Sequence, residues 1–238
     1  MCRSVQEKLS IFYMKIAIYT VTRGDIGLTL LNKSIQPLLL DPAISFHYKE
    51  NNTLSLSKCY NEFLDSKGKN FDYAIFVHDD VFLDDLRLTE KICRAHVSYD
   101  IVGLAGGISP VIRAPALWHI MCGGFNGGNL RGAVAHPCSK DQIMVTNFGP
   151  APARVAILDG LFLSVDVRKI NSVRWRFNEN YEFHHYDIAS SIDANNKHLK
   201  LGVAPIWVMH ASPGLLNVND ERFTASQEKF LSEYSSRS

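Results

Sequence analysis

Three residues whose side chains could bind a cation follow one apolar run. Residues 74–77 are Ala-Ile-Phe-Val, and His78, Asp79 and Asp80 come directly after them. Two adjacent carboxylates at the end of a buried segment repel each other and are costly to take out of water. A divalent cation would compensate for that cost, because hard cations take carboxylate oxygens and bridge to phosphates. A solvated turn without a ligand is the alternative interpretation.

The run before these residues predicts where they lie. Residues 74–77 lack the alternation of a half-buried strand, so both faces of the strand should be covered, as in an inner strand of a parallel sheet. In open α/β sheets, ligands bind beyond the carboxyl ends of the strands. The pattern therefore favours a ligand site at His78, Asp79 and Asp80.

The first third of the chain predicts alternating strands and helices. Strand patterns cover 15–21 and 44–50, and Leu28 to Leu38 recur at helical spacing. Residues 56–64 form one apolar stripe, with Ser55 as N-cap and Lys67-Gly68 as the helix end. This alternation indicates βαβ units. We predict a single α/β domain over residues 15–238, with a mostly parallel central sheet flanked by helices, after an N-terminal extension, residues 1–14.

The remaining two thirds are less regular. Glycines and prolines cluster between residues 105 and 152 without periodicity, which predicts a long functional or mobile loop, and we hypothesise a lid. A disordered insertion is the alternative, and short strands that the sequence does not resolve could form in part of the segment. Further elements are expected as follows: a helix at 86–98, strands at 101–104, 155–167 and 203–209, a helix from 188 to 199, and a peripheral helix beyond 216.

Composition excludes several classes of protein. The 238 residues are 46% hydrophobic and 21% charged, and the formal charge is +1, so no strong field points to nucleic acid. Five dispersed cysteines indicate a reducing compartment rather than a disulfide scaffold or a zinc cluster. No apolar run approaches the ~20 residues of a membrane span, and the N-terminus lacks a signal-peptide core. We expect a cytoplasmic protein without a transmembrane segment.

Four stretches in order resemble the GT-A glycosyltransferases, in particular the family-2-like group of small bacterial enzymes. They are 54–61 (LSLSKCYN), 75–83 (IFVHDDVFL), 157–165 (ILDGLFLSV) and 183–212. The resemblance covers nearly everything from Lys15 to Gly214. It implies a GT-A-like, Rossmann-like domain with an antiparallel portion on the acceptor side.

The resemblance also implies roles for four residues. Asp79 would hold the ribose or first phosphate of a nucleotide sugar, Asp80 and His210 would bind the metal, and Asp187 would be the general base. Asp80 and His210 each end a predicted strand, and two strand ends at one sheet edge can bring both to one ion. His78 departs from the pattern, because many relatives have an acidic residue there. Without the resemblance, His210 could be a buried, hydrogen-bonded histidine and Asp187 a helix N-cap.

On the donor side, the resemblance places Asn61 in the helix that packs under the nucleotide. Arg131 could clamp the diphosphate, because a guanidinium binds phosphate in a bidentate manner. Arg23 and Glu50 follow predicted strand ends and could contact the base.

On the acceptor side, the resemblance places Asp159 and Gly160 in a strand that faces the acceptor. Trp175, between two arginines, could stack on the acceptor as an exposed ring or lie in the core. His184 and His185 are expected at the surface.

The sequence thus predicts a metal-dependent glycosyltransferase that uses Mn²⁺ or Mg²⁺. It would transfer a sugar from a nucleotide-diphospho-sugar, preferentially a UDP-sugar, to a hydroxyl of a saccharide or other acceptor, with inversion, in polysaccharide biosynthesis. The metal would neutralise the leaving diphosphate and the base would take the acceptor proton. A metal-dependent nucleotidyl or phosphoryl-transfer enzyme and a non-catalytic nucleotide-sugar-binding module are the alternatives.

Overall fold

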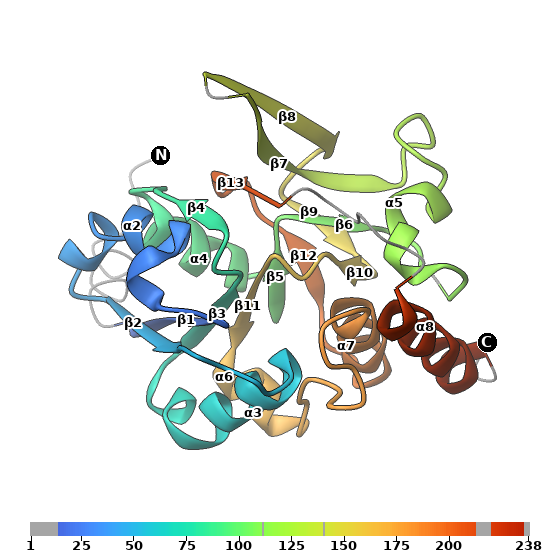
Figure 1. Cartoon of the computed structure of the whole chain (residues 1–238), viewed down its shortest axis with the longest axis horizontal. Helices are drawn as coiled ribbons and strands as arrows, with labels where there is room; N and C mark the ends of the chain where they lie inside the picture. Colours follow the sequence, from blue (N-terminus) through green and yellow to red (C-terminus); the bar gives the residue numbers. More distant parts are fainter. Residues whose placement is uncertain (1–13, 111, 140, 213–219, 236–238) are drawn as a thin grey trace.

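A computed structural model describes residues 14–110, 112–139, 141–212 and 220–235 (Figure 1). The predicted N-terminal extension, apart from Met14, lies outside these residues. The described chain folds into two sheets with helices packed around them. Figure 1 shows the strands β1 to β3 at one side of the molecule and the helices α7 and α8 at the other.

The larger sheet contains the strand that ends at the acidic residues. In the described chain it has seven strands in the order β2-β1-β3-β11-β5-β12-β9. β1 is parallel to β2 and β3, as the βαβ pattern predicts, whereas β11 enters antiparallel between β3 and β5. Their bounds are β1 (Ile16–Val21), β2 (Ile44–Lys49), β3 (Tyr73–Val77), β5 (Ile101–Gly103), β9 (Ala153–Val155), β11 (Phe162–Asp166) and β12 (Leu201–Val203).

Every residue of β1 and β3 is buried, as the unbroken apolar runs predict. The predicted α/β class is confirmed, and the parallel character of the larger sheet lies in β2-β1-β3 and in the pair β5-β12. The antiparallel portion begins at β11.

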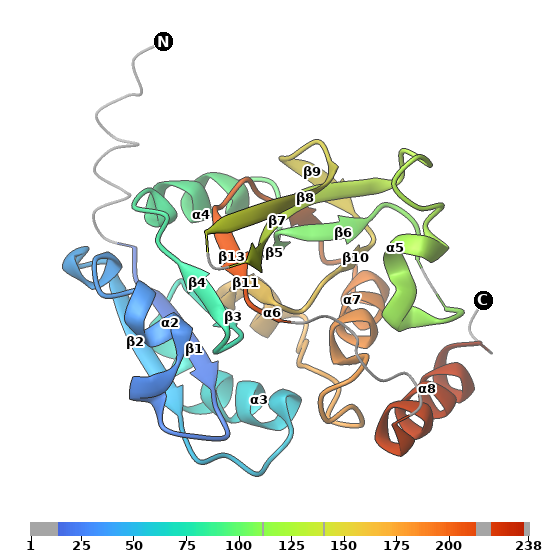
Figure 2. The ribbon, with the colours of Figure 1, turned by 45° about the horizontal axis from the view of Figure 1, so that its top comes forward.

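A second sheet crosses the end of β3. Over the described residues its order is β10-β6-β7-β13-β4, and β8 pairs with β7. Figure 2 shows β4 and β13 meeting beside the end of β3. The bounds are β4 (Val81–Leu83), β6 (Ala105–Gly107), β7 (Leu130–Ser139), β8 (Gln142–Gly149), β10 (Ile157–Leu158) and β13 (Val208–His210).

The second sheet corrects the expectation of a structureless segment between residues 105 and 152. β6, η4 (Pro115–Leu117), α5 (Trp118–Met121), β7 and β8 all lie within it. The glycines allow close packing here rather than looseness. Gly132 has a φ of 95°, and a Cβ there would overlap the Leu104 carbonyl. The lid hypothesis stays a prediction.

The predicted helix around Leu28 to Leu38 is shorter than expected. It divides into η1 (Ile26–Leu28), α2 (Leu30–Ser34) and η2 (Leu38–Leu40), and Leu28 is 74% exposed. The break lies at Thr29, whose extended backbone and hydroxyl cap α2. α3 (Leu56–Ser66), in contrast, begins at the predicted cap Ser55, whose hydroxyl accepts a hydrogen bond from the Lys58 N–H.

The other helices surround the sheets. α3 contacts β1, α4 contacts β5, and α7 contacts β10 and β12. None of the described helices is long and apolar enough to cross a membrane. The bounds are η3 (Gly68–Asn70), α4 (Leu88–His96), α6 (Val167–Ser172), α7 (Tyr186–Asn196) and α8 (Glu221–Tyr234).

Three expectations about the C-terminal half need correction. The single strand predicted at 203–209 is two strands, β12 and β13, which belong to different sheets. The strand predicted at 155–167 is likewise divided into β9, β10 and β11. α8 is not simply peripheral, because Phe223, Phe230 and Tyr234 are buried.

Candidate functional site

His78, Asp80 and His210, here called the metal cluster, come together where the two sheets meet. His78 and Asp80 lie in the tight turn between β3 and β4, which the Val81 N–H closes onto the His78 carbonyl at 3.3 Å. β13 pairs antiparallel with β4, with Val81 opposite His210. One possible ligand atom from each member of the cluster lies within 4.8 Å of the other two.

The pairing of β4 with β13 corrects how His210 was expected to reach Asp80. The sequence predicts two strand ends at one edge of one sheet. In the structure, His210 ends a strand of the second sheet, and the Ala211 N–H donates to the Asp80 carbonyl at 3.0 Å. The meeting is therefore made by an antiparallel ladder that crosses the end of β3.

The cluster leaves two buried polar atoms without hydrogen bonds. His210 Nε2 and Asp80 Oδ1 are 3.2 Å apart, but in the described chain neither has a hydrogen-bonding partner. Buried polar atoms are rarely left in this state, because the desolvation is not compensated. Two imidazoles and one carboxylate are also a donor set that binds divalent metals. The residues present thus fit a metal ion.

The electrostatics of the cluster suit a cation. Burial would raise the pKa of Asp80, but the neighbouring His210 and His78 hold that pKa below its ordinary value. Burial lowers the pKa of His78, and the nearby His210 lowers it further. An ionised carboxylate and a neutral imidazole are the protonation states in which these groups bind metals.

Asp159 and Asp187, here called the acidic pair, form the other side of the site. Asp159 precedes β11, and Asp187 lies in the first turn of α7. Asp187 Oδ2 accepts a hydrogen bond from the Gly160 N–H at 3.0 Å, and Oδ1 accepts from the Ile188 N–H at 2.8 Å. Burial and then the charge of Asp159 raise the pKa of Asp187 to about 7.

The N-cap alternative for Asp187 is wrong. The cap position of α7 belongs to His185, which has a φ of 64° and makes no side-chain capping bond. His185 is also buried, at 4% exposure, rather than at the surface as expected, and its Nδ1 lies 2.8 Å from the Ser226 hydroxyl. Asp187 instead links α7 to Gly160 through the hydrogen bond that its Oδ2 accepts.

Tyr186 joins the two sides of the site. Its phenol donates to the Gly160 carbonyl at 2.7 Å and lies 3.0 Å from His78 Nε2. The pairing of β11 with β3 sets this proximity, because the His78 N–H donates to the Leu161 carbonyl at 3.1 Å. Sequence reasoning placed His78 in a ligand site but did not single out Tyr186. The only signal for Tyr186 was its adjacency to Asp187.

Trp118 is a second residue that the sequence did not indicate. Its indole N–H donates to Asp159 Oδ2 at 3.3 Å, while Asp159 Oδ1 accepts from the Leu161 N–H at 3.2 Å. It lies in α5, inside the segment expected to be structureless. Asp159 is thereby held in place beside Asp187.

Three predicted donor residues lie on exposed or half-exposed turns that follow strands of the larger sheet. Asp79 is half-buried in the β3–β4 turn, and its carbonyl accepts from the Leu31 N–H. Arg23 is exposed in the turn after β1. Burial lowers the pKa of nearby His184, and the charge of Arg23 lowers it further. Glu50 is exposed after β2, and its carboxylate accepts from the Ile26 N–H at 3.2 Å.

The side chains of Asn61 and Arg131 form hydrogen bonds with the protein backbone. The Asn61 amide is buried, donates to the Phe177 carbonyl at 2.9 Å and accepts from the Phe177 N–H at 3.0 Å. This corrects the donor-binding prediction for Asn61, because its polar atoms are already occupied. The Arg131 guanidinium donates to the carbonyls of Gly128 and Leu130, each at 2.7 Å, and its role as a clamp stays a prediction.

Trp175 lies in the core. Its ring is 1% exposed, and its indole N–H donates to the Ser190 carbonyl of α7 at 3.2 Å. The interpretation as an exposed, acceptor-stacking ring is therefore wrong. The alternation of apolar and charged residues around Trp175 buries the tryptophan and turns its arginine neighbours outward, so Arg176 pairs with Asp65.

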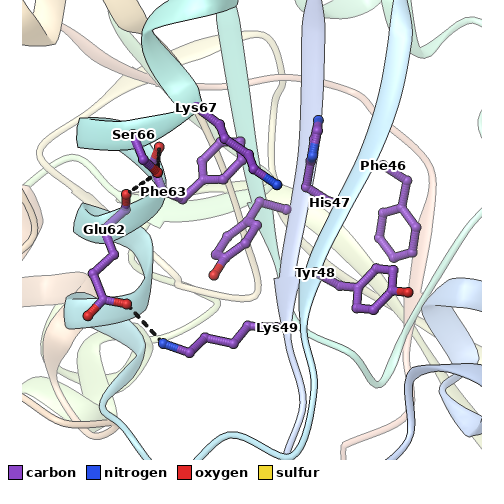
Figure 3. Close-up of a pocket in the computed structure, with 9 residues that line it drawn as sticks. Phe46, His47, Tyr48, Lys49, Glu62, Phe63, Ser66 and Lys67 are labelled. Atoms are coloured by element: carbon purple, nitrogen blue, oxygen red, sulfur yellow. Dashed lines mark hydrogen bonds and ion pairs between the residues drawn. The ribbon is translucent and has the colours of Figure 1, made fainter.

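A separate hollow of about 430 Å³ opens between β2 and α3 (Figure 3). Figure 3 shows Lys67 of the loop after α3 reaching over it toward His47 of β2. Lys49 and Glu62 form an ion pair of 2.9 Å across its rim. None of the site residues predicted from the sequence lines it.

The fold is that of the GT-A glycosyltransferases. The structure is similar to S. aureus TarS 1-349 in complex with UDP, at 10% identity and a TM-score of 0.51, over 94% of this chain and 71% of that one. It is also similar to GalNAc-T7 with UDP, GalNAc and Mn²⁺, at 8% identity and a TM-score of 0.56, over 92% of this chain and 48% of that one. At these identities the similarity shows the fold alone.

The sequence identifies the family. The chain belongs to the Glycosyltransferase like family, whose model matches residues 47–234. No curated protein matches the chain. The matched residues include the metal cluster and the acidic pair.

Proposed function

We propose that this glycosyltransferase transfers a sugar from a UDP-sugar to a hydroxyl of an acceptor, with a divalent metal and with inversion. The observation that carries the proposal is the pair of buried atoms, Asp80 Oδ1 and His210 Nε2, which lie 3.2 Å apart and have no hydrogen bonds among the described residues. The similarity to S. aureus TarS 1-349 in complex with UDP-GlcNAc, at 11% identity and a TM-score of 0.52, supports the choice of donor.

Asp80 and His210 would hold the metal, Mn²⁺ or Mg²⁺, with His78 beside them. The bound ion would act as a Lewis acid that stabilises the charge of the departing diphosphate. Asp79 would hold the ribose or first phosphate, with Arg23 and Glu50 near the base. Arg23, Glu50 and Asp79 follow strands β1, β2 and β3, respectively. Ligands of open α/β sheets bind at such strand ends.

Asp187 would be the general base. As the acceptor oxygen bonds to the anomeric carbon, the bond from that carbon to the diphosphate breaks and the hydroxyl proton passes to the Asp187 carboxylate. A pKa of about 7 suits this step, because a base works best when its pKa is near the operating pH. The Gly160 N–H fixes the direction of the carboxylate.

Asp159 would orient the acceptor or tune the base. After burial, the charge of Asp159 is the next cause of the raised pKa of Asp187, and the Trp118 indole N–H donates to Asp159 Oδ2. The match to a glycosyltransferase family model favours sugar transfer over nucleotidyl transfer. Polysaccharide biosynthesis stays a prediction.

Titration of UDP into the protein with and without Mn²⁺, followed by an assay of sugar release from a panel of nucleotide sugars, tests the proposal. We expect UDP to bind more tightly with Mn²⁺ and one UDP-sugar to turn over. Metal-dependent UDP binding without turnover of any donor would favour the binding module. Nucleotide binding that is indifferent to Mn²⁺ would contradict the metal assignment.

A further inference from the structure

The phenol of Tyr186 lies beside the Gly160 carbonyl, the His78 ring and the Tyr60 side chain. Tyr186 is 3% exposed, and its hydroxyl oxygen lies 2.7 Å from the Gly160 carbonyl oxygen and 3.0 Å from His78 Nε2. A carbonyl accepts hydrogen bonds and cannot donate them. The Tyr186 proton is therefore directed to Gly160, and the contact with His78 needs a proton from the imidazole.

This requirement sets the tautomer of His78. A neutral imidazole carries one N–H and one lone pair, and the hydrogen bond made by one nitrogen decides which state the other is in. With Nε2–H donated to Tyr186, the lone pair is on Nδ1. His78 is then able to coordinate a cation without breaking its bond to Tyr186.

We propose that His78 is a third ligand of the metal through Nδ1, and that Tyr186 is the positioning residue that holds it in this tautomer. The inference rests on the proposed metal site at Asp80 and His210. One possible ligand atom of His78 lies within 4.8 Å of one from each of those residues. Histidines that bind metals commonly donate their other N–H to an acceptor, which fixes the ring. Here the Tyr186 hydroxyl is the acceptor for the Nε2–H of His78.

Gly160 is shaped to support this arrangement. A Cβ on Gly160 would lie 2.5 Å from the Tyr186 hydroxyl oxygen and 2.9 Å from Asp187 Cβ, so a larger residue would displace both. The carbonyl of Gly160 accepts from Tyr186, and its N–H donates to Asp187 Oδ2. One glycine thus positions the partner of a metal ligand and the base together.

The proposal has a consequence for metal choice. Two imidazoles and one carboxylate suit Mn²⁺ and later transition metals, whereas Mg²⁺ prefers oxygen ligands in a nearly ideal octahedron. We expect the protein to bind Mn²⁺ in preference to Mg²⁺, and His78→Ala to reduce that preference by removing one of the two nitrogen ligands.

The test measures Mn²⁺ binding to the whole protein without any sugar, by the EPR signal of free Mn²⁺. Tyr186→Phe keeps the ring and removes the hydroxyl, so we expect Mn²⁺ affinity to fall about 10–100-fold. Tyr181→Phe is the matched control. Its phenol is also in a buried residue and donates to Glu233 Oε2 at 3.0 Å, outside the metal cluster. We expect it to leave Mn²⁺ affinity within about twofold, although it loses one hydrogen bond of similar kind.

A second measurement needs no variant. In the metal-free wild-type protein, long-range ¹H–¹⁵N NMR spectra should show His78 protonated at Nε2 and not at Nδ1. A proton on Nδ1 would overturn the proposal, as would a Tyr186→Phe protein that melts like wild type and binds Mn²⁺ equally well. If wild type binds no Mn²⁺, the proposed metal site itself fails. If it binds Mn²⁺ in a manner that depends on Asp80 but not on Tyr186, only the present inference fails.

Discussion

The two sides of the site differ in how far the protein itself satisfies their hydrogen-bonding groups. On the metal side, Asp80 Oδ1 and His210 Nε2 are buried and have no hydrogen bonds within the part of the chain that the structure describes. On the acidic side, both oxygens of Asp187 accept backbone N–H groups, and Asp159 is held by Trp118. The fold alone thus supplies partners to the acidic side, whereas the metal side keeps two polar atoms that a bound cation would satisfy.

The pKa values of two aspartates, Asp80 and Asp187, are shifted in opposite directions. The neighbours of Asp80 are imidazoles, and its pKa is below the ordinary value despite its burial. The neighbour of Asp187 is another carboxylate, and burial and that charge raise its pKa to about 7. One carboxylate thereby stays ionised to lower pH than usual, and the other keeps its proton up to nearly neutral pH.

Removal of the metal-side carboxylate should have the largest effect. Asp80→Ala takes away one ligand and leaves His210 without its acidic neighbour, so we expect metal-dependent UDP binding to be lost. Calorimetric titration of UDP with Mn²⁺ measures it. Asp84→Ala, which removes a carboxylate outside the metal cluster, is the control and should bind as wild type does. Unchanged Mn²⁺-dependent UDP binding in Asp80→Ala would contradict the assignment of Asp80 to a metal site.

Removal of the base should slow transfer without affecting the donor. Asp187→Asn keeps the size of the side chain and removes its basicity, so we expect turnover to fall by about 10²–10⁴-fold. UDP-sugar affinity should stay near wild type, because a group that acts in the transition state contributes little to ground-state binding. Turnover and donor affinity measured on this variant decide the point, and retained transfer would sink the catalytic assignment.

The pH dependence should report Asp187. Transfer needs the carboxylate, so turnover should rise as pH increases through about 7. Asp159→Asn removes the like charge and should move this rise to lower pH, although burial, the larger cause of the raised pKa, remains. A pH–rate profile of both proteins measures the shift. A profile that stays in place would mean that Asp159 does not act on the base.

Stability should change with pH in the opposite sense. The unfolded chain releases the Asp187 proton near its ordinary pKa of 3.8, whereas the folded protein holds it until about pH 7. The folded state therefore binds more protons in this interval, and this group makes the free energy of unfolding fall as pH rises from about 4 to 7. Urea unfolding of wild type and Asp187→Asn at several pH values measures it. Parallel curves for the two proteins would contradict the raised pKa.

The smallest effect on function should come from a residue that belongs to neither side. Asn61→Ala leaves the buried backbone groups of Phe177 without partners, so we expect the free energy of unfolding to fall by about 1–3 kcal/mol. UDP affinity should stay within about twofold of wild type. Thermal melting and UDP titration measure the two effects, and a large loss of UDP affinity at unchanged stability would restore the donor role of Asn61.

Local features of this protein were readable in its sequence. The run at residues 74–77 predicts the buried strand β3, and the stripe after Ser55 predicts α3 with its cap, because periodicity and capping involve neighbours in the chain. The acidic residues at the end of β3 likewise predict a cation site at that place. These inferences needed no contact between distant segments.

The tertiary structure decided which distant residues lie beside these local features. The β4–β13 ladder brings His210 to Asp80, and a contact across 108 residues joins Tyr186 to His78. Trp175 and Asn61 look available for ligands in the sequence but are occupied by the core. Strand pairing and burial depend on which distant segments share a sheet, and the residue spacing within a single segment does not encode that choice.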